Sequence, residues 1–392
     1  MKKFFILLLI FAFLGCENGE NLENSANLPT QNAKNSINSA TQNAENTTNS
    51  AAQNEKFAQN AKNLENSTNT TNSAEFTEQN LTQNSTQTKV FRVFATVSPT
   101  TTLLEVLYPE GIIGLNHKPN PQDLAFLPER IATLPALGSF NTMNFEQLVA
   151  LKPDLIIFSA PPHLKKFTQS AFTEPFEKLG IKTLIVGFGF EDFENSVRAI
   201  SSALGVQERG QRLLDFYQRQ AARLENLRKK VAKKPRIYFA YGVEGLQTHC
   251  ASEDEVDLAE LIGAQNAVKC EQIFVAKDSQ PLNFEQILLL DPEAIFASEK
   301  SLYVELTSRP SEQWRRVAAV KNKRVFYVPE SPSNWLVRPP TMMRIVGYSW
   351  AFSKLHPDLM SDAEAKKIAQ EFFAEFLRPL SDEDYERLEG KR

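Results

Sequence analysis

The chain has 392 residues and carries 43 Lys and Arg against 47 Asp and Glu, for a formal net charge of −4. Without an excess of positive charge, the chain lacks the field that holds a nucleic-acid backbone, and we exclude nucleic acid as a partner. Composition is uneven along the chain, and only roughly 300 residues have the makeup of a globular domain.

Residues 1–15 have the pattern of a signal peptide. Lys2 and Lys3 precede an apolar stretch over residues 4–14, as in export signals. The stretch is shorter than the roughly 20 residues that a membrane-spanning helix needs. We therefore predict an exported chain.

Leu14-Gly15-Cys16 resembles the lipobox of bacterial lipoproteins, in which the cysteine is acylated and becomes the new N-terminus. The match departs from the usual pattern at Phe13, where the box normally has Leu. The resemblance implies that Cys16 carries lipid and anchors the chain to a membrane of the periplasm. The alternative is a soluble secreted protein.

Residues 16–88 consist almost wholly of Asn, Ser, Thr, Gln, Ala, Glu and Lys after the cysteine. Such a composition buries too little apolar surface to offset the entropy of the chain. We predict a disordered, lipid-anchored tether that allows the following domain to reach a membrane partner.

The first globular region is predicted to be an α/β lobe over residues 89–192. A strand over 90–96 is followed by a helix start at Ser98-Pro99-Thr100, and further strands are predicted over 154–158 and 182–186. Strands that alternate with helices predict a largely parallel sheet.

A linking helix is predicted over residues 193–232, because apolar residues recur there at helical spacing. Pro235 ends it, and a strand over 236–241 opens a second α/β lobe over residues 233–380. This lobe includes a helix over 341–355, and residues 381–392 are expected to be a tail.

The strongest internal signal is a repeat, because residues 143–154 and 282–293 align without a gap. Each copy predicts a short amphipathic helix that begins after an Asn cap, stops at a Pro and leads into an apolar strand. We predict an α/β fold of two Rossmann-like lobes, joined by one long backbone helix, with a ligand cleft between them.

With these features, residues 90–375 resemble the helical-backbone class (class III) of periplasmic binding proteins, which serve ABC importers of iron-siderophore, haem and cobalamin. The most specific segments are 137–157 and 282–293. The resemblance implies that Glu146 and Glu285 dock on arginines of the permease. Without the resemblance, each is also an acid in a first helical turn, where it favours the helix dipole.

The resemblance further implies a ligand site at loops that follow the carboxyl ends of the strands, as expected in open α/β sheets. The candidate ligand-binding residues in these loops are Ser98, His117, Ser139, His163, Tyr241, Gln247, His249, Tyr303, Trp335 and Arg338.

Three of the four histidines lie in these loops, and neutral imidazole is a good ligand for Fe, Ni, Cu and Zn. His117 and His249 are the candidate metal ligands. The sequence has no HxxxH or HExxH pair, which disfavours a preformed zinc site. Arg338 is expected to pair a carboxylate or catecholate while Trp335 packs on a flat ligand; the alternative is that Arg338 caps a helix and Trp335 is core.

If Cys16 carries lipid, Cys250 and Cys270 remain as a pair in an exported chain. Either they form a disulfide or they are two buried thiols, since sequence alone does not report the distance between them.

The sequence lacks the GxSxG, HExxH and GxxxxGK[ST] motifs, so we predict that the chain is not an enzyme and that a separate ATPase drives transport. We predict a monomeric substrate-binding lipoprotein without a cofactor of its own, whose partners are an ABC permease and a metal complex. A ferric siderophore leads the expected ligands, with a nickel or cobalt chelate, haem, cobalamin or molybdate as alternatives. A secreted enzyme or an adhesion lipoprotein is the alternative from another class.

Overall fold

The computed structural model describes most of the chain after residue 89. The described residues are 90–140, 142–160, 165–187, 190, 192–248, 250, 258–270, 274–275, 278–279 and 281–391. The predicted signal peptide, the predicted tether and the predicted lipidation site Cys16 lie outside them, as do the candidate ligand residues His163 and His249.

The N-terminal lobe contains a parallel sheet in the order β1-β2-β3, formed by Val93–Ala95, Leu155–Ser159 and Lys182–Val186. Phe94 lies opposite Ile156, and Ile157 lies opposite Leu184. All three predicted strands are confirmed. The helical segments of this lobe are α3 (Ser98–Leu107), η1 (Pro109–Gly111), η2 (Asp123–Ala125), η3 (Glu129–Thr133), α4 (Phe145–Ala150), α5 (Lys165–Thr168), η5 (Gln169–Thr173) and α6 (Glu174–Lys178).

The C-terminal lobe contains a second parallel sheet in the order β5-β4-β8-β9. Its strands are Arg236–Ala240 (β4), Gln265–Asn266 (β5), Ala294–Ala297 (β8) and Val325–Tyr327 (β9), and a separate antiparallel pair is formed by Phe274–Val275 (β6) and Asp278–Ser279 (β7). The helical segments are α9 (Leu258–Leu261), α10 (Phe284–Leu290), α11 (Lys300–Ser308), η7 (Trp314–Arg316), α12 (Ala318–Lys321), α13 (Arg344–Leu355), α14 (Asp362–Phe376) and α15 (Asp382–Leu388). Two separate parallel sheets confirm the predicted two-lobed α/β fold.

The connection between the sheets corrects the prediction of one helix over 193–232. Two helices are present, α7 (Phe193–Leu204) and α8 (Gln207–Arg228). Gly205 separates them because it adopts a left-handed conformation with φ of 72° and caps the carbonyls of Ser201 and Ser202. Helix α8 alone spans about 33 Å at 1.5 Å per residue.

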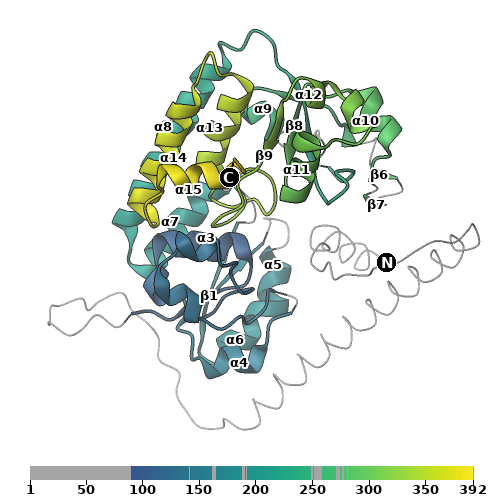
Figure 1. Ribbon diagram of the computed structural model, residues 1–392. Helices are drawn as coiled ribbons and strands as arrows, with labels where there is room; N and C mark the ends of the chain where they lie inside the picture. Colours follow the sequence, from purple (N-terminus) through teal and green to yellow (C-terminus); the bar gives the residue numbers. More distant parts are fainter. Residues whose placement is uncertain are drawn as a thin grey trace, which may run out of the picture. The chain divides into compact units, whose positions relative to one another are not determined.

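The lobes share a hydrophobic core on the helical side of the molecule. One continuous cluster includes Val93 of β1, Phe216 of α8, Phe352 of α13 and Phe373 of α14. Helix α13 packs against both α8 and α14, and Figure 1 shows the three helices alongside one another. A shared core of this kind resists wide separation of the two sheets.

The prediction that residues 381–392 form a tail is wrong, because residues 381–391 contain α15. Ser381 caps this helix by accepting the backbone N–H of Asp384, and Tyr385 and Leu388 are buried. The Glu389 carboxylate, only 3% exposed, lies 2.5 Å from the Lys354 ammonium and accepts the indole N–H of Trp350 at 2.9 Å. The C-terminal residues are therefore part of the folded unit.

Within the ranges that the structure describes, no helix is both long enough and apolar enough to cross a membrane.

Candidate ligand-binding and docking sites

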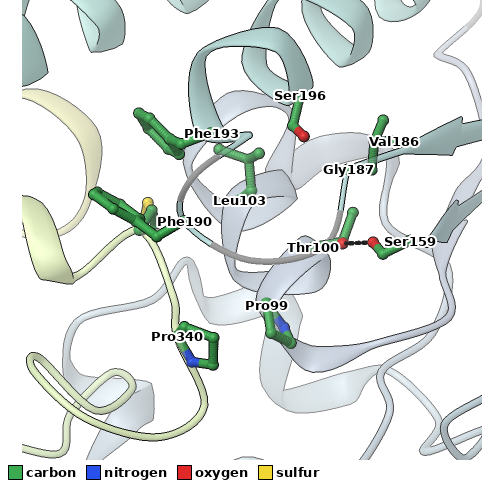
Figure 2. A pocket seen from close by; sticks show the side chains of 11 residues that line it. Pro99, Thr100, Leu103, Ser159, Val186, Gly187, Phe190, Phe193, Ser196 and Pro340 are labelled. Carbon is green, nitrogen blue, oxygen red and sulfur yellow. Dashed lines mark hydrogen bonds between the residues drawn. The ribbon is translucent and has the colours of Figure 1, made fainter. Parts of the chain in front are cut away.

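A small pocket lies where the carboxyl ends of β2 and β3 meet the first turn of α3 (Figure 2). Ser159 and Val186 end the two strands, and Thr100 lies in the helix turn. Pro340 and Met342 close the pocket from the C-terminal lobe. The pocket is thus formed by both lobes, at the strand ends where open α/β sheets place their ligands.

Hydroxyl groups supply the polar side of this pocket. The hydroxyls of Thr100 and Ser159 lie 2.5 Å apart in a hydrogen bond, as Figure 2 shows. The Ser196 hydroxyl is buried and has no hydrogen-bond partner among the described residues. Phe190 and Phe193 supply an apolar wall. Such hydroxyls can donate to a carboxylate or to an inorganic oxyanion.

The size of the pocket limits what can enter it. Its cavity volume is about 30 Å³, whereas a buried water needs about 10–15 Å³ and a whole drug-sized ligand about 300–1,000 Å³. As it stands, the pocket accommodates one small polar group rather than an entire metal chelate.

Residues 328–343, which we call the interlobe segment, provide further contacts between the lobes. The Ser331 hydroxyl donates to the carboxyl group of Asp123, which lies in η2 of the N-terminal lobe. Pro340 and Met342 approach the start of α3 in the pocket described above. The segment therefore touches the opposite lobe near both of its ends.

Arg338 lies between these two contacts and is exposed. It forms no hydrogen bond or ion pair with any described residue. Its neighbour Arg344, by contrast, donates to the carbonyls of Leu336 and Val337 at 2.9 and 2.8 Å. Of these two guanidinium groups, that of Arg338 has all of its donors available to an anionic ligand.

Tyr241, at the carboxyl end of β4, lies near both guanidinium groups. Its hydroxyl is buried without a hydrogen-bond partner in the described part of the chain. Burial raises the pKa of Tyr241 above its usual value, and the charges of Arg338 and Arg344 oppose that rise. A neutral phenol can donate to an anion that a guanidinium group also binds. Tyr241 and Arg338 interact electrostatically, and their joint role in ligand binding stays a prediction.

Ser98 and His117, two of the predicted ligand residues, lie close together. Ser98 Oγ lies 3.4 Å from His117 Nδ1. Asn116 fixes the histidine loop, because it accepts from Thr101 at 2.7 Å and donates to the Ala95 carbonyl at 3.0 Å. His117 itself remains exposed.

The described residues contain no cluster of three or more His, Cys, Asp or Glu side chains that could hold a metal ion. The second metal candidate, His249, lies outside the described residues.

Three carboxyl groups lie close to the contact between the lobes, and burial raises the pKa of each. Burial, with a smaller contribution from the charge of Asp123, raises the pKa of Glu105 in α3 to about 8. Burial also raises the pKa of Asp123, against the lowering effect of the Ser331 hydrogen bond. Burial and the charge of Glu299 raise the pKa of Glu330 to about 7.

Trp335 requires a correction, since the sequence suggested that it packs on a ligand. It is 0% exposed, and its ring lies 5.8 Å from Phe373 and 6.3 Å from Tyr385. Its indole N–H donates to the Ser331 carbonyl at 2.9 Å. Trp335 is therefore part of the core beneath the interlobe segment.

The remaining candidate residues are Ser139, Gln247 and Tyr303. The backbone N–H of Ser139 donates to the Thr142 hydroxyl, and the carbonyl of Gln247 accepts from Tyr241. The Tyr303 ring lies 5.9 Å from that of Tyr327. No described contact joins these three residues to Arg338 or His117, and their role in ligand binding stays a prediction.

Residues 143–154 and 282–293, which we call the docking elements, have the same local structure. The side-chain oxygens of Asn144 and Asn283 each accept a backbone N–H at 2.9 Å, from Gln147 and Gln286 respectively. These bonds cap α4 and α10 as predicted. Glu146 and Glu285, in the first turns, are exposed and form no hydrogen bond or ion pair within the described ranges.

Each docking element is also attached to its sheet in the same way. The backbone N–H of Arg92 donates to Asp154 at 2.9 Å, and that of Arg236 donates to Glu293 at 2.9 Å. The two guanidinium groups donate to carbonyls at the ends of the helices, Arg92 to Leu151 at 2.7 Å and Arg236 to Asp291 at 3.2 Å. Neither arginine was predicted from the sequence, although each lies where the first strand of its lobe begins.

The structure joins Cys250 and Cys270 in a disulfide that closes a loop of 20 residues. The sequence left open whether the two cysteines form a disulfide or are two buried thiols, and the structure has the disulfide. Cys250 belongs to the same core cluster as Ile287 of α10, so the bridge lies in the core that supports the C-terminal docking element.

Residues 97–332 match the model of the periplasmic binding protein family. This match covers more than half of the chain and agrees with the two-lobed fold and the interlobe pocket. The chain belongs to the periplasmic binding protein family, whose class III members serve ABC importers, and the resemblance seen in the sequence is confirmed.

The chain is also similar to individual proteins of known ligand or structure. The chain is 28% identical to an ABC transporter solute binding protein from Sulfurospirillum deleyianum, with a TM-score of 0.66 over 77% of this chain and 94% of that one. It is 24% identical to the Fe(3+)-citrate-binding protein YfmC of Bacillus subtilis over 49% of this chain, and 23% identical to the molybdate-binding protein MolA of Haemophilus influenzae over 62%. The chain spans 58% of the length of the first of these two and 72% of the second.

Proposed function

We propose that this chain is the solute-binding component of an ABC importer and delivers an anionic metal complex to a permease. The observation that carries the proposal is the pair of docking elements, which present an exposed, unpaired glutamate from each lobe on the same scaffold. Two such acids suit two basic sites on a membrane partner. The permease works with a separate ATPase, and the binding protein acts as a monomer.

The ligand is proposed to be a ferric complex with free carboxylate or catecholate oxygens, such as a ferric siderophore or ferric citrate. Arg338 supports this choice, because it is exposed and unpaired, and its charge acts on Tyr241, whose buried hydroxyl has no hydrogen-bond partner among the described residues. His117, on the opposite lobe, can add one imidazole nitrogen. A relative that binds Fe(3+)-citrate agrees with this class of ligand.

A molybdate-like oxyanion is the second candidate. The observation that favours it is the small hydroxyl-lined pocket of Thr100, Ser159 and Ser196, which matches a compact anion better than a bulky chelate. The similarity to a molybdate-binding protein agrees with it. No comparable feature of the described residues favours a nickel or cobalt chelate, haem or cobalamin.

Calorimetric titration of the purified chain tests the proposal. The panel contains ferric citrate, a ferric catecholate siderophore, a nickel chelate, haem, cobalamin and molybdate. Calorimetry is preferred to tryptophan fluorescence because Trp314, Trp335 and Trp350 are all buried. We expect one anionic ferric complex to bind with a dissociation constant of about 1 μM or lower. Tight binding of an uncharged ligand alone, or of none, would contradict the ligand assignment.

Export and anchoring form a separate part of the proposal. Family membership agrees with a periplasmic location, and we propose that acylated Cys16 anchors the chain there. Mass spectrometry of the mature N-terminus, with Cys16→Ser as the matched variant, tests the anchor. A mature chain that begins elsewhere or carries no acyl group would refute it.

A further inference from the structure

The two docking elements differ mainly in what they expose. Caps, strand attachments and even the left-handed residue after each helix are shared, since Lys152 and Asp291 have φ of 49° and 38°. The backbone N–H of the capping residue differs, since that of Asn144 donates to the Leu137 carbonyl and that of Asn283 to the Gln286 side chain. The shared contacts do not require the exposed positions to differ. A residue that differs between the two elements at an exposed position can therefore contact a partner.

Leu289 is the clearest such difference. Its side chain is 87% exposed, more than that of any other large hydrophobic residue in the described ranges. The aligned position in the N-terminal element is Ala150, which is also exposed. Leu289 therefore adds an apolar group to one element only.

Leu289 does not contribute to the packing of the lobe. Ile287 is the buried residue of α10, and Leu288 and Leu290 pack in part against the core of the C-terminal lobe. Leu289 packs against neither core cluster. It follows Glu285 by four residues, and residues four apart lie on the same face of a helix.

We propose that Leu289 is an apolar anchor for the permease, placed beside the charged contact of Glu285. The inference rests on the proposed docking role of Glu285. The partner that fits this face has a basic side chain next to an apolar depression, because an unpaired acid and an exposed leucine lie one helical turn apart. The N-terminal element, with Glu146 and Ala150, makes a contact without an apolar side chain of that size, so the C-terminal element contributes more of the binding.

The test measures binding of the full chain, loaded with its ligand, to the permease and ATPase in lipid nanodiscs. We expect Leu289→Ala to weaken the complex about tenfold, because the interface loses the buried apolar area of the leucine side chain, while ligand affinity stays unchanged. Val304→Ala on α11 is the matched control, because Val304 is also exposed, at 46%, but lies outside the docking elements. It is expected to bind as the unmodified chain does.

The outcomes separate this inference from the proposed function. If Leu289→Ala binds as tightly as the unmodified chain while Glu285→Lys weakens the complex, the apolar anchor is wrong and docking through the glutamates stands. If neither Glu285→Lys nor Glu146→Lys changes binding, the proposed docking itself fails. Because Leu289 and both glutamates are exposed, these variants are expected to fold, and a thermal unfolding scan checks it.

Discussion

The docking elements and the interlobe segment are organised in opposite ways. The docking elements occur twice, with the same caps and the same attachment to the first strand of each sheet. Residues 328–343 occur once, and the C-terminal lobe alone supplies Ser331, Arg338 and Pro340 to the region between the lobes. Under the proposed function, the permease binds a repeated surface, whereas the ligand is selected by a segment that occurs once.

The largest expected effect concerns the support of the interlobe segment. Glu389→Ala leaves the Lys354 ammonium, only 8% exposed, without its closest carboxylate and removes the acceptor of the Trp350 indole. Removing one partner of a buried ion pair costs about 3–5 kcal/mol, and we expect the lower end of this range because Asp362 still lies 2.9 Å from the Lys354 ammonium. Helix α15 also packs on Trp335 beneath the segment, so we expect ligand affinity to fall as well.

Urea denaturation checks the loss of stability. Glu208→Ala is the control, because Glu208 forms an exposed pair with Arg212 and its loss is expected to cost less than about 1 kcal/mol. Equal effects of the two variants would show that the C-terminal helix does not support the fold.

Removing the disulfide is expected to destabilise the C-terminal docking element and to leave the N-terminal one unchanged. Replacing Cys250 and Cys270 with serine frees a loop of 20 residues in the core that holds Ile287 of α10. Loop entropy predicts a loss of about 3 kcal/mol. We expect hydrogen exchange to rise in α10 and to stay unchanged in α4. A uniform rise in both helices would contradict the assignment of the bridge to one lobe.

Arg338 tests whether the interlobe segment selects the ligand. Arg338→Gln removes the one guanidinium group of the segment that no described residue engages, and a charge-assisted hydrogen bond is worth about 1.5–3 kcal/mol. We therefore expect the dissociation constant of the ligand to rise about 10- to 100-fold, while binding to the permease is unchanged. Arg309→Gln, an exposed arginine after α11, is the control. Equal affinities of the two variants would remove Arg338 from the site.

A smaller effect is expected from the proton on Glu105. Its pKa is about 8 in the folded chain against 4.5 for the ordinary side chain. Between these values, the folded chain holds a proton that the unfolded chain has released. Stability therefore falls as the pH rises from about 4.5 to 8, and levels off above 8.

Glu105→Gln should remove this slope and be more stable than the unmodified chain at pH 8.5, by at least about 1 kcal/mol. Thermal unfolding as a function of pH, with exposed Glu129→Gln as control, measures it. A slope that persists in Glu105→Gln would assign the effect to Asp123 or Glu330 instead.

Local signals in the sequence were sufficient for much of the fold. The predicted strands, the Asn caps and the repeat correspond to observed elements, because each depends on neighbouring residues. The break at Gly205 was missed, since the helical pattern continues on both sides and only the left-handed φ reveals the turn. The cap of α15 at Ser381 was missed because its sequence is highly charged, although Tyr385 and Leu388 are buried.

The candidate site was harder to predict, because it depends on residues far apart in the chain. The hydroxyl-lined pocket joins Thr100, Ser159 and Ser196 from three separate elements, and Ser196 fell within a helix that was expected only to connect the lobes. Trp335 shows the opposite error, since an aromatic residue in a loop was expected in the cleft and lies in the core. Arg338 and Glu146, by contrast, could be proposed from the sequence because both are exposed on segments with recognisable boundaries.

The most direct test of docking through the two glutamates is transport by the reconstituted importer with the double variant Glu146→Lys/Glu285→Lys. We expect ligand uptake into proteoliposomes to fall to the level without binding protein, while the calorimetric affinity for the ligand is unchanged. Uptake at the normal rate, or a loss of ligand affinity in the same variant, would contradict it.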